Sequence, residues 1–209
     1  MNEIFSVAKE IRRLYPTLSY DHRPFLPSKD TGMAVKRTEE FRIGYACFKH
    51  AVASVIKPKS ICEIGVGSGI AARAFLRAVP DVEYFGIDSR LDEKEAEYPI
   101  FEHAQKLVKA INSNSDFLVS DSMELDSLWK PYDLVHVDAC HEYKYAYHDM
   151  ELAWKSGSKW ILVDDAKDST VAAAVLEVVR RYHPGSTSMA YFEAAWTGNL
   201  LFCLEEAYP

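Results

Sequence analysis

The sequence predicts an α/β fold, with a mostly parallel sheet, helices on both faces of that sheet and an antiparallel hairpin at its C-terminal end. Two observations predict it. Between residues 60 and 182, short runs rich in β-branched and aromatic residues alternate with longer stretches of helical periodicity, and such alternation requires crossover connections between parallel strands. Beyond residue 182, two strand-like runs follow one another without a helix between them, which is typical of a hairpin.

The first part of the chain, residues 1–59, is predicted to be a helical cap that belongs to the same domain as the core, residues 60–209. Apolar residues recur at helical spacing over residues 2–14, until a proline ends the pattern. Residues 16–35 contain several prolines among polar residues and are typical of a loop. A second helix is predicted over residues 38–56.

The core is predicted to contain five β/α units followed by the hairpin. The expected strands are Ser60–Ile64, Glu83–Ile87, Asp116–Val119, Tyr132–Val137, Trp160–Val163, Thr187–Phe192 and Asn199–Leu204. The expected helices are Ile70–Val79, Pro99–Asn112, Tyr143–Trp154 and Thr170–Tyr182, with a short turn around Leu125–Trp129.

Composition and charge exclude several classes of protein. The 209 residues are 48% hydrophobic and 26% charged, enough apolar material for a single core. A formal net charge of -7 argues against a nucleic-acid partner. The four cysteines lack the spacing of a zinc site, so we expect reduced thiols. No long apolar run or leader-like segment is present, so we expect a soluble, cytoplasmic protein without a membrane partner.

The densest cluster of glycines lies between the first strand and the helix that follows it. The segment reads Glu-Ile-Gly-Val-Gly-Ser-Gly-Ile and contains Gly65, Gly67 and Gly69. An ordinary tight turn needs one glycine, whereas three let the backbone approach a ligand closely. The loop amides and the helix N-terminus favour a polar or anionic, nucleotide-like group. A dinucleotide-binding loop places its third glycine one residue later, so the spacing disfavours NAD.

Two aspartates follow the next strands along the chain. Asp88 ends the second strand, where a carboxylate can accept both ribose hydroxyls, and Asp121 follows the third strand. Either aspartate alone would also suit a helix cap or a solvated strand end. Together with the glycine loop, their successive strand-end positions favour a nucleoside ligand.

The glycine segment resembles the first motif of class I S-adenosylmethionine (SAM)-dependent methyltransferases, in which an acidic residue stands two places before Gly-x-Gly-x-Gly. The resemblance implies a Rossmann-like seven-stranded sheet, whose strand order includes the C-terminal hairpin. It also implies that Glu63 and the glycines border the methionine part of SAM, and that Asp121 receives the adenine amine. The cofactor-binding residues would then be Glu63, Gly65, Gly67, Gly69, Asp88, Asp121, Ser122 and Met123.

Three more aspartates follow the fourth and fifth strands, Asp138 after the fourth and Asp164 and Asp165 after the fifth. The carboxyl ends of parallel strands meet at one edge of an open sheet, so these side chains should converge. A hard divalent cation, magnesium or another, would relieve their repulsion. Alternatively, Asp164 caps a loop and Asp165 is solvated.

A narrower resemblance starts at Asp138, where the sequence reads Asp-x-x-His-x-Tyr, with Asp-Asp after the next strand. This pattern resembles the short bacterial metal-dependent O-methyltransferases of the catechol and sugar type. The resemblance implies that Asp138, Asp164 and Asp165 bind a metal ion that chelates the acceptor hydroxyl. His141, three residues after Asp138, would be the general base, although a structural hydrogen bond to backbone would also suit it.

These observations predict a SAM-dependent O-methyltransferase that acts on a small hydroxylated molecule, such as a diol, catechol or sugar, with Asp138 and His141 in catalysis. Two residues depart from the family pattern, Ala139 for glycine and Cys140 for aspartate, which keeps open a catalytically silent SAM-binding or partner-binding module. N-methylation is a further alternative, but the sequence has no Asn-Pro-Pro-Tyr-like stretch and no basic patch. The identity of the acceptor and the formation of a homo-oligomer stay open.

Overall fold

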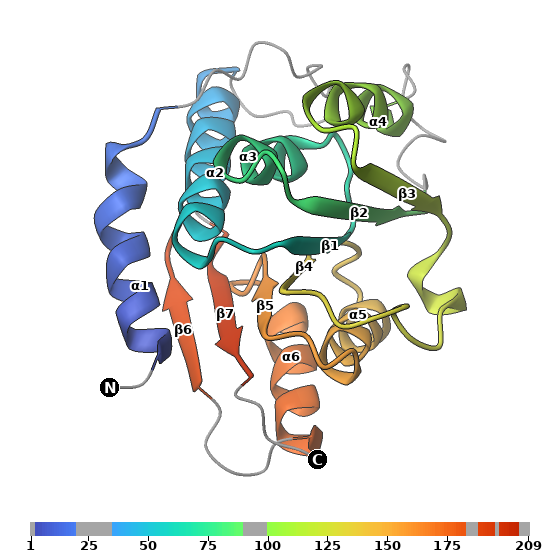
Figure 1. The fold of residues 1–209 in the computed structure, drawn as a ribbon. Coiled ribbons are helices and arrows are strands. Elements are labelled where there is room, and N and C mark those ends of the chain that lie inside the picture. Colours follow the sequence, from blue (N-terminus) through green and yellow to red (C-terminus); the bar gives the residue numbers. More distant parts are fainter. Residues whose placement is uncertain (1–2, 20–34, 90–99, 183–187, 195–196, 205–209) are drawn as a thin grey trace.

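The computed structural model describes residues 3–19, 35–89, 100–182, 188–194 and 197–204 (Figure 1). The helices are α1 (Glu3–Leu14), α2 (Val35–Ile56), α3 (Ile70–Ala78), α4 (Ile100–Ile111), α5 (Tyr143–Lys155) and α6 (Ser169–Tyr182), with short 3-10 helices η1 (Tyr15–Thr17) and η3 (Ser122–Glu124). The strands are β1 (Ser60–Ile64), β2 (Glu83–Asp88), β3 (Ser115–Val119), β4 (Leu134–Val137), β5 (Trp160–Val163), β6 (Ser188–Phe192) and β7 (Asn199–Cys203).

The seven strands form one sheet in the order β3-β2-β1-β4-β5-β7-β6. Strands β1 to β5 are parallel, and β7 runs antiparallel to both of its neighbours. The strand order reverses between β1 and β4, and the crevice at such a reversal is where open α/β sheets bind ligands. The predicted fold class, a mostly parallel sheet that ends in an antiparallel hairpin, is confirmed.

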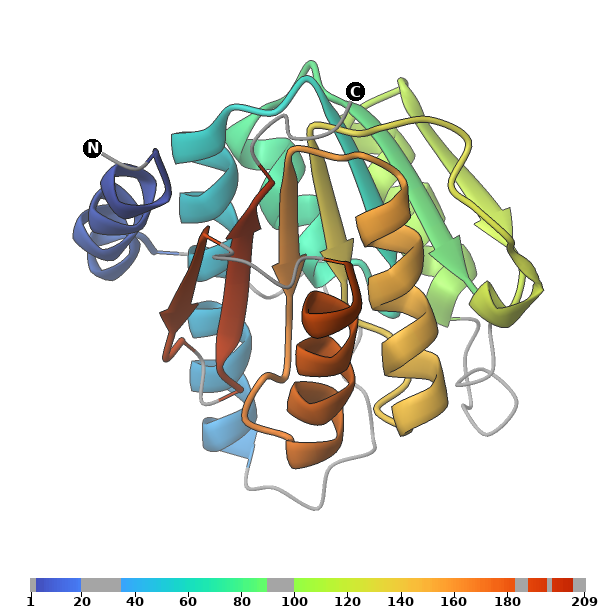
Figure 2. The ribbon, with the colours of Figure 1, turned by 90° about the horizontal axis from the view of Figure 1, so that it is seen from below.

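Helices cover both faces of the sheet (Figure 2). On one face, α2 and α3 contribute Phe48 and Phe75 to a core that also contains Ile61 of β1. On the other face, α5 and α6 contribute Met150 and Val175 to a second core. Burial of both faces explains why the central strands read as continuous apolar runs instead of alternating ones.

Helix α1 packs beside α2 and beside the edge strand β6. Ile4, Ala8 and Ile11 form its buried stripe and belong to the same core as the first sheet face, and Arg12 donates a hydrogen bond to the Tyr191 carbonyl of β6 at 2.9 Å. The division into a cap over residues 1–59 and a core stays a prediction. Within the described parts of the chain, no helix combines the length and apolarity needed to cross a bilayer. The cytoplasmic location also stays a prediction.

Some predicted bounds and elements differ from the structure. Helix α2 starts at Val35, three residues before its predicted start. Helix η3 was not predicted. It precedes the turn expected around residues 125–129, where the chain bends, and the Asp121 side chain accepts the Met123 amide and fixes the first turn of η3. Strand β4 starts two residues later than predicted, since the Tyr132 and Asp133 amides donate to the side chains of Ser158 and Ser60. Most of the predicted loop over residues 16–35 lies outside the described residues.

Candidate active site

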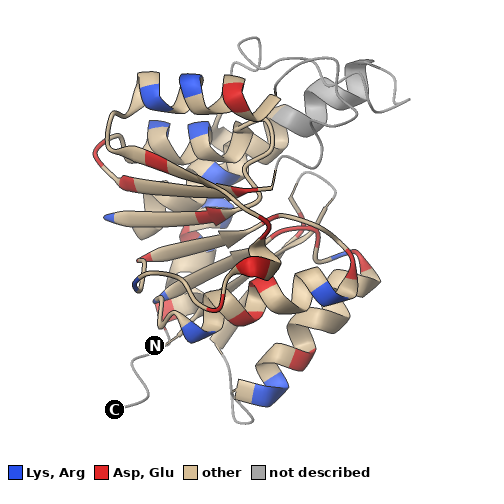
Figure 3. Cartoon of the chain, turned by 90° about the vertical axis from the view of Figure 1, so that its right-hand side faces the viewer, with Lys and Arg blue, Asp and Glu red and all other residues tan. Residues whose placement is uncertain are grey.

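A cavity of about 560 Å³ opens at the carboxyl ends of the parallel strands. Its walls come from the glycine loop after β1, the ends of β2 to β5, Tyr45 of α2 and Thr197 just before β7. Acidic positions mark several of the loops that follow the strands (Figure 3). The cavity therefore brings together the two groups of residues that the sequence suggested, one after β1 to β3 and one after β4 and β5.

The glycine loop is in close contact with the sheet at one end and open at the other. At Gly65 the backbone has a φ of +89°, and a Cβ there would lie 2.0 Å from the Asp138 carbonyl oxygen. At Gly67 the φ is +51°, and a Cβ would meet no atom within 4 Å. Only glycine allows the first approach, and the second position leaves the backbone accessible to a ligand in the cavity.

Asp88 anchors this loop at the end of β2. Its carboxylate accepts the amides of Val66 at 3.0 Å and Gly67 at 2.8 Å, and it lines the cavity. The sequence predicted Asp88 as a partner of ribose. The structure shows that this carboxylate orders the loop that would surround the ligand, and the contact with ribose stays a prediction.

Glu63 lies beneath the loop and is not part of the cavity wall, contrary to the expectation that it borders the cofactor directly. Its carboxyl accepts the Tyr84 hydroxyl and lies 3.1 Å from Nδ1 of His136. Burial raises the pKa of Glu63 and lowers the pKa of His136. Glu63 thus joins β1 to β2 and β4, and His136 is the core residue that the strand pattern predicted.

The residues expected near adenine follow β3. Asp121 lines the cavity, accepts the Met123 amide at 3.0 Å and receives the Tyr145 hydroxyl at 3.4 Å. Ser122 also lines the cavity. Met123 is 41% exposed and lies outside the lining, so only the first two of these predicted residues face the cavity.

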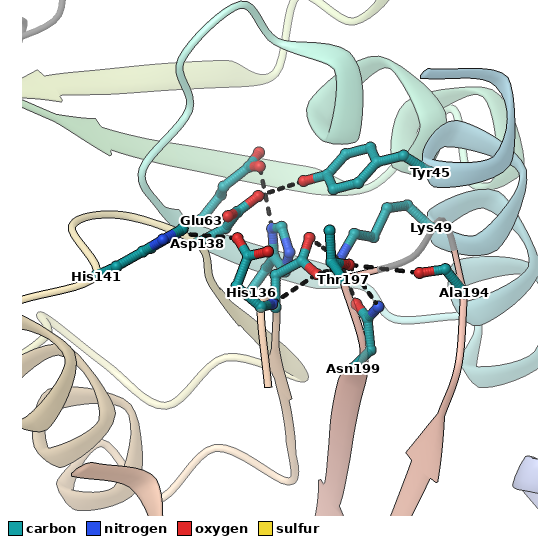
Figure 4. Close-up of polar contacts among 11 residues, drawn as sticks. Tyr45, Lys49, Glu63, His136, Asp138, His141, Ala194, Thr197 and Asn199 are labelled. Atoms are coloured by element: carbon teal, nitrogen blue, oxygen red, sulfur yellow. Dashed lines mark hydrogen bonds and ion pairs between the residues drawn. The ribbon is translucent and has the colours of Figure 1, made fainter. Parts of the chain in front are cut away.

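Asp138 lines the same cavity next to the glycine loop, and it accepts the hydroxyl of Tyr45 from α2 (Figure 4). Burial and the neighbouring Asp164 raise the pKa of Asp138 to about 7, although Lys49 and the Tyr45 hydroxyl act in the opposite direction. A carboxyl with a pKa in this range exchanges its proton near neutral pH.

Asp164 is buried and surrounded by hydrogen-bond donors. Its Oδ2 lies 3.0 Å from Nζ of Lys49, and its Oδ1 accepts the Thr197 hydroxyl and the Asp165 amide, each at 2.8 Å. The Lys49 ammonium also donates to Oδ1 of Asn199 at 2.8 Å. Figure 4 shows Tyr45 and Lys49 extending from α2 toward this group of strand-end residues.

Asp165 adopts a left-handed backbone conformation, with a φ of +52°. Its Oδ2 lies 2.9 Å from Nε2 of His141, and this hydrogen bond raises the pKa of His141. His141 is about half exposed and borders a second, much smaller cavity next to Asp138, outside the lining of the main one. Asp165 itself faces the main cavity.

The chain matches the family of methyltransferase domains over residues 62–166. It belongs to this family. The matched range begins in β1 and ends just after Asp165, so it contains the glycine loop and all three strand-end aspartates. No curated protein matches the chain in sequence.

Solved structures of methyltransferases share the fold. The O-methyltransferase TomG of Streptomyces achromogenes, in complex with SAM, is 19% identical, with a TM-score of 0.53 over 98% of this chain and 90% of that one. The methyltransferase PaMTH1 of Podospora anserina, bound to S-adenosylhomocysteine (SAH), is 15% identical, with a TM-score of 0.59 over 99% and 97% of the chains. The Bacillus cereus O-methyltransferase in complex with SAH is 11% identical, with a TM-score of 0.55 over 95% and 91%. The predicted Rossmann-like fold and enzyme class, a SAM-dependent methyltransferase, are confirmed.

The geometry does not place the three predicted metal ligands of the methyltransferase in one group. Among the described residues, two sets of side chains have ligand atoms within 4.8 Å of one another, His136 with Asp138 and Asp164, and Asp138 with His141 and Asp165. Neither set holds all three aspartates. The first set contains the carboxylate already paired with Lys49, and the second contains the His141–Asp165 pair. The residues therefore fit the predicted three-carboxylate magnesium site poorly.

Sequence reasoning missed four residues of the site, namely Tyr45, Lys49, Thr197 and Asn199. The first two lie on α2, Thr197 lies just before β7 and Asn199 starts it, and all four are far along the chain from the aspartates of the site. One signal was available. Lys49 stands within the apolar run Ala46–Val52, which a helix can bury only if the lysine finds an acidic partner.

Proposed function

We propose that this methyltransferase transfers a methyl group from SAM to a hydroxyl group of a small molecule. One observation carries the proposal: a single cavity is lined both by an open glycine loop and by a carboxyl whose pKa is about 7. The first feature suits the cofactor and the second suits an acceptor that must lose a proton.

The residues at the loop end fit SAM in size and chemistry. The cavity volume is within the usual range for a ligand of this size. Asp88 and Asp121 supply carboxylates for the ribose hydroxyls and the adenine amine, and the open side of Gly67 lets the ligand approach the backbone. When bound, SAM supplies an activated methyl group on its sulfonium.

Asp138 acts as the general base. It lines the cavity, and its pKa matches neutral pH, where both proton uptake and release are efficient. The Tyr45 hydroxyl holds its carboxyl in place. His141, the base expected from the sequence, is a second candidate, since Asp165 orients its ring, but it borders the smaller cavity. Proton removal makes the acceptor oxygen nucleophilic, and the cavity walls align it for displacement.

The acceptor class follows from the charge and size of the site. The net charge of -7 and the acidic cavity do not favour a phosphate-rich acceptor. A small phenol, catechol, diol or sugar fits a cavity of this volume. Metal assistance, which the narrower resemblance implied, is left out of the proposal because Asp164 already has three donors.

The proposal is tested by calorimetric titration with SAH, followed by a methyl-transfer assay with SAM against phenols, catechols, diols and sugars. We expect micromolar SAH binding and transfer to at least one hydroxyl acceptor, and we expect Asp138→Asn to slow this transfer by about 10² to 10⁴-fold. Absence of SAH binding would overturn the proposal. Binding without transfer to any acceptor would instead support the silent SAM-binding module.

A further inference from the structure

A buried lysine stands where the sequence predicted a metal ion. Lys49 has no exposed surface, and its Nζ lies 3.0 Å from Oδ2 of Asp164 and 2.8 Å from Oδ1 of Asn199. The same nitrogen lies 4.7 Å from the ring centre of Tyr45 and 5.6 Å from that of Phe48. The ammonium is therefore held by two oxygens and two aromatic rings.

These surroundings fit an ammonium ion better than a divalent metal. Aromatic faces attract an ammonium group, whereas magnesium and calcium require six or more oxygen ligands. The other oxygen of Asp164 accepts the Thr197 hydroxyl and the Asp165 amide. A metal ion that bound Asp164 would have to displace Lys49 from a fully enclosed position.

The other two aspartates also have donors from the protein. Asp138 accepts the Tyr45 hydroxyl, and Asp165 pairs with His141. Each of the three carboxylates is thus satisfied by a different side chain. Lys49 therefore offsets, within the chain itself, part of the repulsion that was the physical reason to expect a metal, although Asp164 still raises the pKa of Asp138.

We propose that Lys49 replaces the divalent cation, so that this methyltransferase needs no metal. Lys49 is a positioning residue: it fixes Asp164 and, through the Tyr45 ring, the hydroxyl that holds Asp138. Without a chelating ion, the acceptor needs one hydroxyl and no second oxygen beside it. The acceptor class therefore widens from catechols and diols to simple phenols and alcohols, and this part rests on the proposed function.

The first test uses the wild-type protein. We expect the Kd for SAH to differ by less than about twofold between buffers with millimolar MgCl2, millimolar MnCl2 or EDTA, and methyl transfer to survive EDTA. Titration with Mg²⁺ or Mn²⁺ alone should give no saturable heat. Binding of one equivalent at submillimolar concentration, with loss of transfer in EDTA, would overturn the proposal.

The second test is a thermal-unfolding cycle. Lys49→Met leaves Asp164 buried without its cation and should lower the Tm by about 10 °C, and Lys49→Met with Asp164→Asn should recover much of that loss. Lys130→Met is the matched control, because Lys130 also pairs with a carboxylate, Glu83, and faces a ring, but on the surface. It should shift the Tm by less than about 2 °C. The proposal is contradicted if Lys49→Met leaves the Tm unchanged, or if the double variant has a lower Tm than Lys49→Met alone.

The double variant also separates positioning from mere stability. We expect it to bind SAH within about twofold of wild type while its kcat falls by about tenfold or more. An unchanged kcat would show that Lys49 only stabilises the fold. Neither the metal titration nor the thermal cycle needs an acceptor, so failure of the proposed function, seen as absent SAH binding, is distinguishable from failure of this inference. Comparison of phenol with catechol in EDTA then tests the wider acceptor class.

Discussion

The two ends of the cavity are built in different ways. The cofactor end uses backbone: a glycine loop with positive φ angles, anchored through amide hydrogen bonds to Asp88. The acceptor end uses buried side chains, with Asp138 and Asp164 contacted by residues of α2. A binding loop made of backbone amides does not titrate, and its conformation depends on the local sequence. A set of buried carboxylates titrates, and the position and pKa of each one depend on contacts between distant parts of the chain.

The largest effect is expected where the two ends touch. In Gly65→Ala, the new Cβ would lie 2.0 Å from the Asp138 carbonyl oxygen, at a φ of +89°. Neither backbone can move without disturbing the sheet, so we expect a loss of more than about 4 kcal/mol in the free energy of unfolding and no SAH binding. Urea denaturation and calorimetry measure both. A stable Gly65→Ala protein that binds SAH would show that the two ends are not in rigid contact.

This difference explains what the sequence could predict. The glycine loop is one continuous segment, and Asp88 and Asp121 stand at strand ends, so local patterns were enough to place them at the cavity. Even there, Glu63 points beneath the loop, because Tyr84 and His136 from neighbouring strands accommodate its carboxyl.

The acceptor end could be predicted only in part. The parallel strands brought Asp138, Asp164 and Asp165 to one edge as expected. Their partners come from far away, since Tyr45 is 93 residues from Asp138 and Lys49 is 115 residues from Asp164. No spacing rule links such pairs, because the packing of α2 against the sheet decides them. The sequence therefore indicated unbalanced negative charge, and a metal was the simplest way to balance it.

The second-largest effect concerns Asp138, the proposed base. Asp138→Asn should slow methyl transfer by about 10² to 10⁴-fold and leave the Kd for SAH nearly unchanged, since the cofactor end is intact. The base must be ionised, so the wild-type rate should rise with pH through the Asp138 pKa of about 7. The variant should lose that limb of the rate profile. If the rate of Asp138→Asn still rises with pH over this range, His141 is the base instead.

A third prediction tests a carboxyl that is buried next to the residues that follow β3. Burial raises the pKa of Asp149 on α5 from 3.8 to about 6, although the Ser122 hydroxyl lowers it. Because the folded-state pKa is above the unfolded one, its contribution to stability is complete below pH 3.8 and is lost as pH rises through about 6. Asp149→Asn should therefore be more stable than wild type at pH 8, by up to about 3 kcal/mol, with no such gain near pH 4.

Denaturation in urea at pH 4, 6 and 8 measures this gain, with the exposed Asp126→Asn as the control. The control should show the same pH dependence as wild type. An Asp149→Asn protein whose advantage does not grow with pH would mean that the carboxyl ionises freely in the folded state despite its burial.

The smallest effect separates backbone strain from ligand contact at the cofactor end. Gly67 and Gly157 both have positive φ angles, +51° and +71°, and a Cβ at either one would meet no atom within 4 Å. Alanine should therefore cost each site a similar strain, about 1 to 2 kcal/mol in the free energy of unfolding. Only Gly67 lines the cavity. Gly67→Ala should weaken SAH binding by about tenfold or more, while Gly157→Ala, beyond the end of α5, should leave it unchanged. Equal SAH affinities in the two variants would mean that the loop tolerates a side chain against the ligand, and that the glycine at this position serves the turn rather than the cofactor.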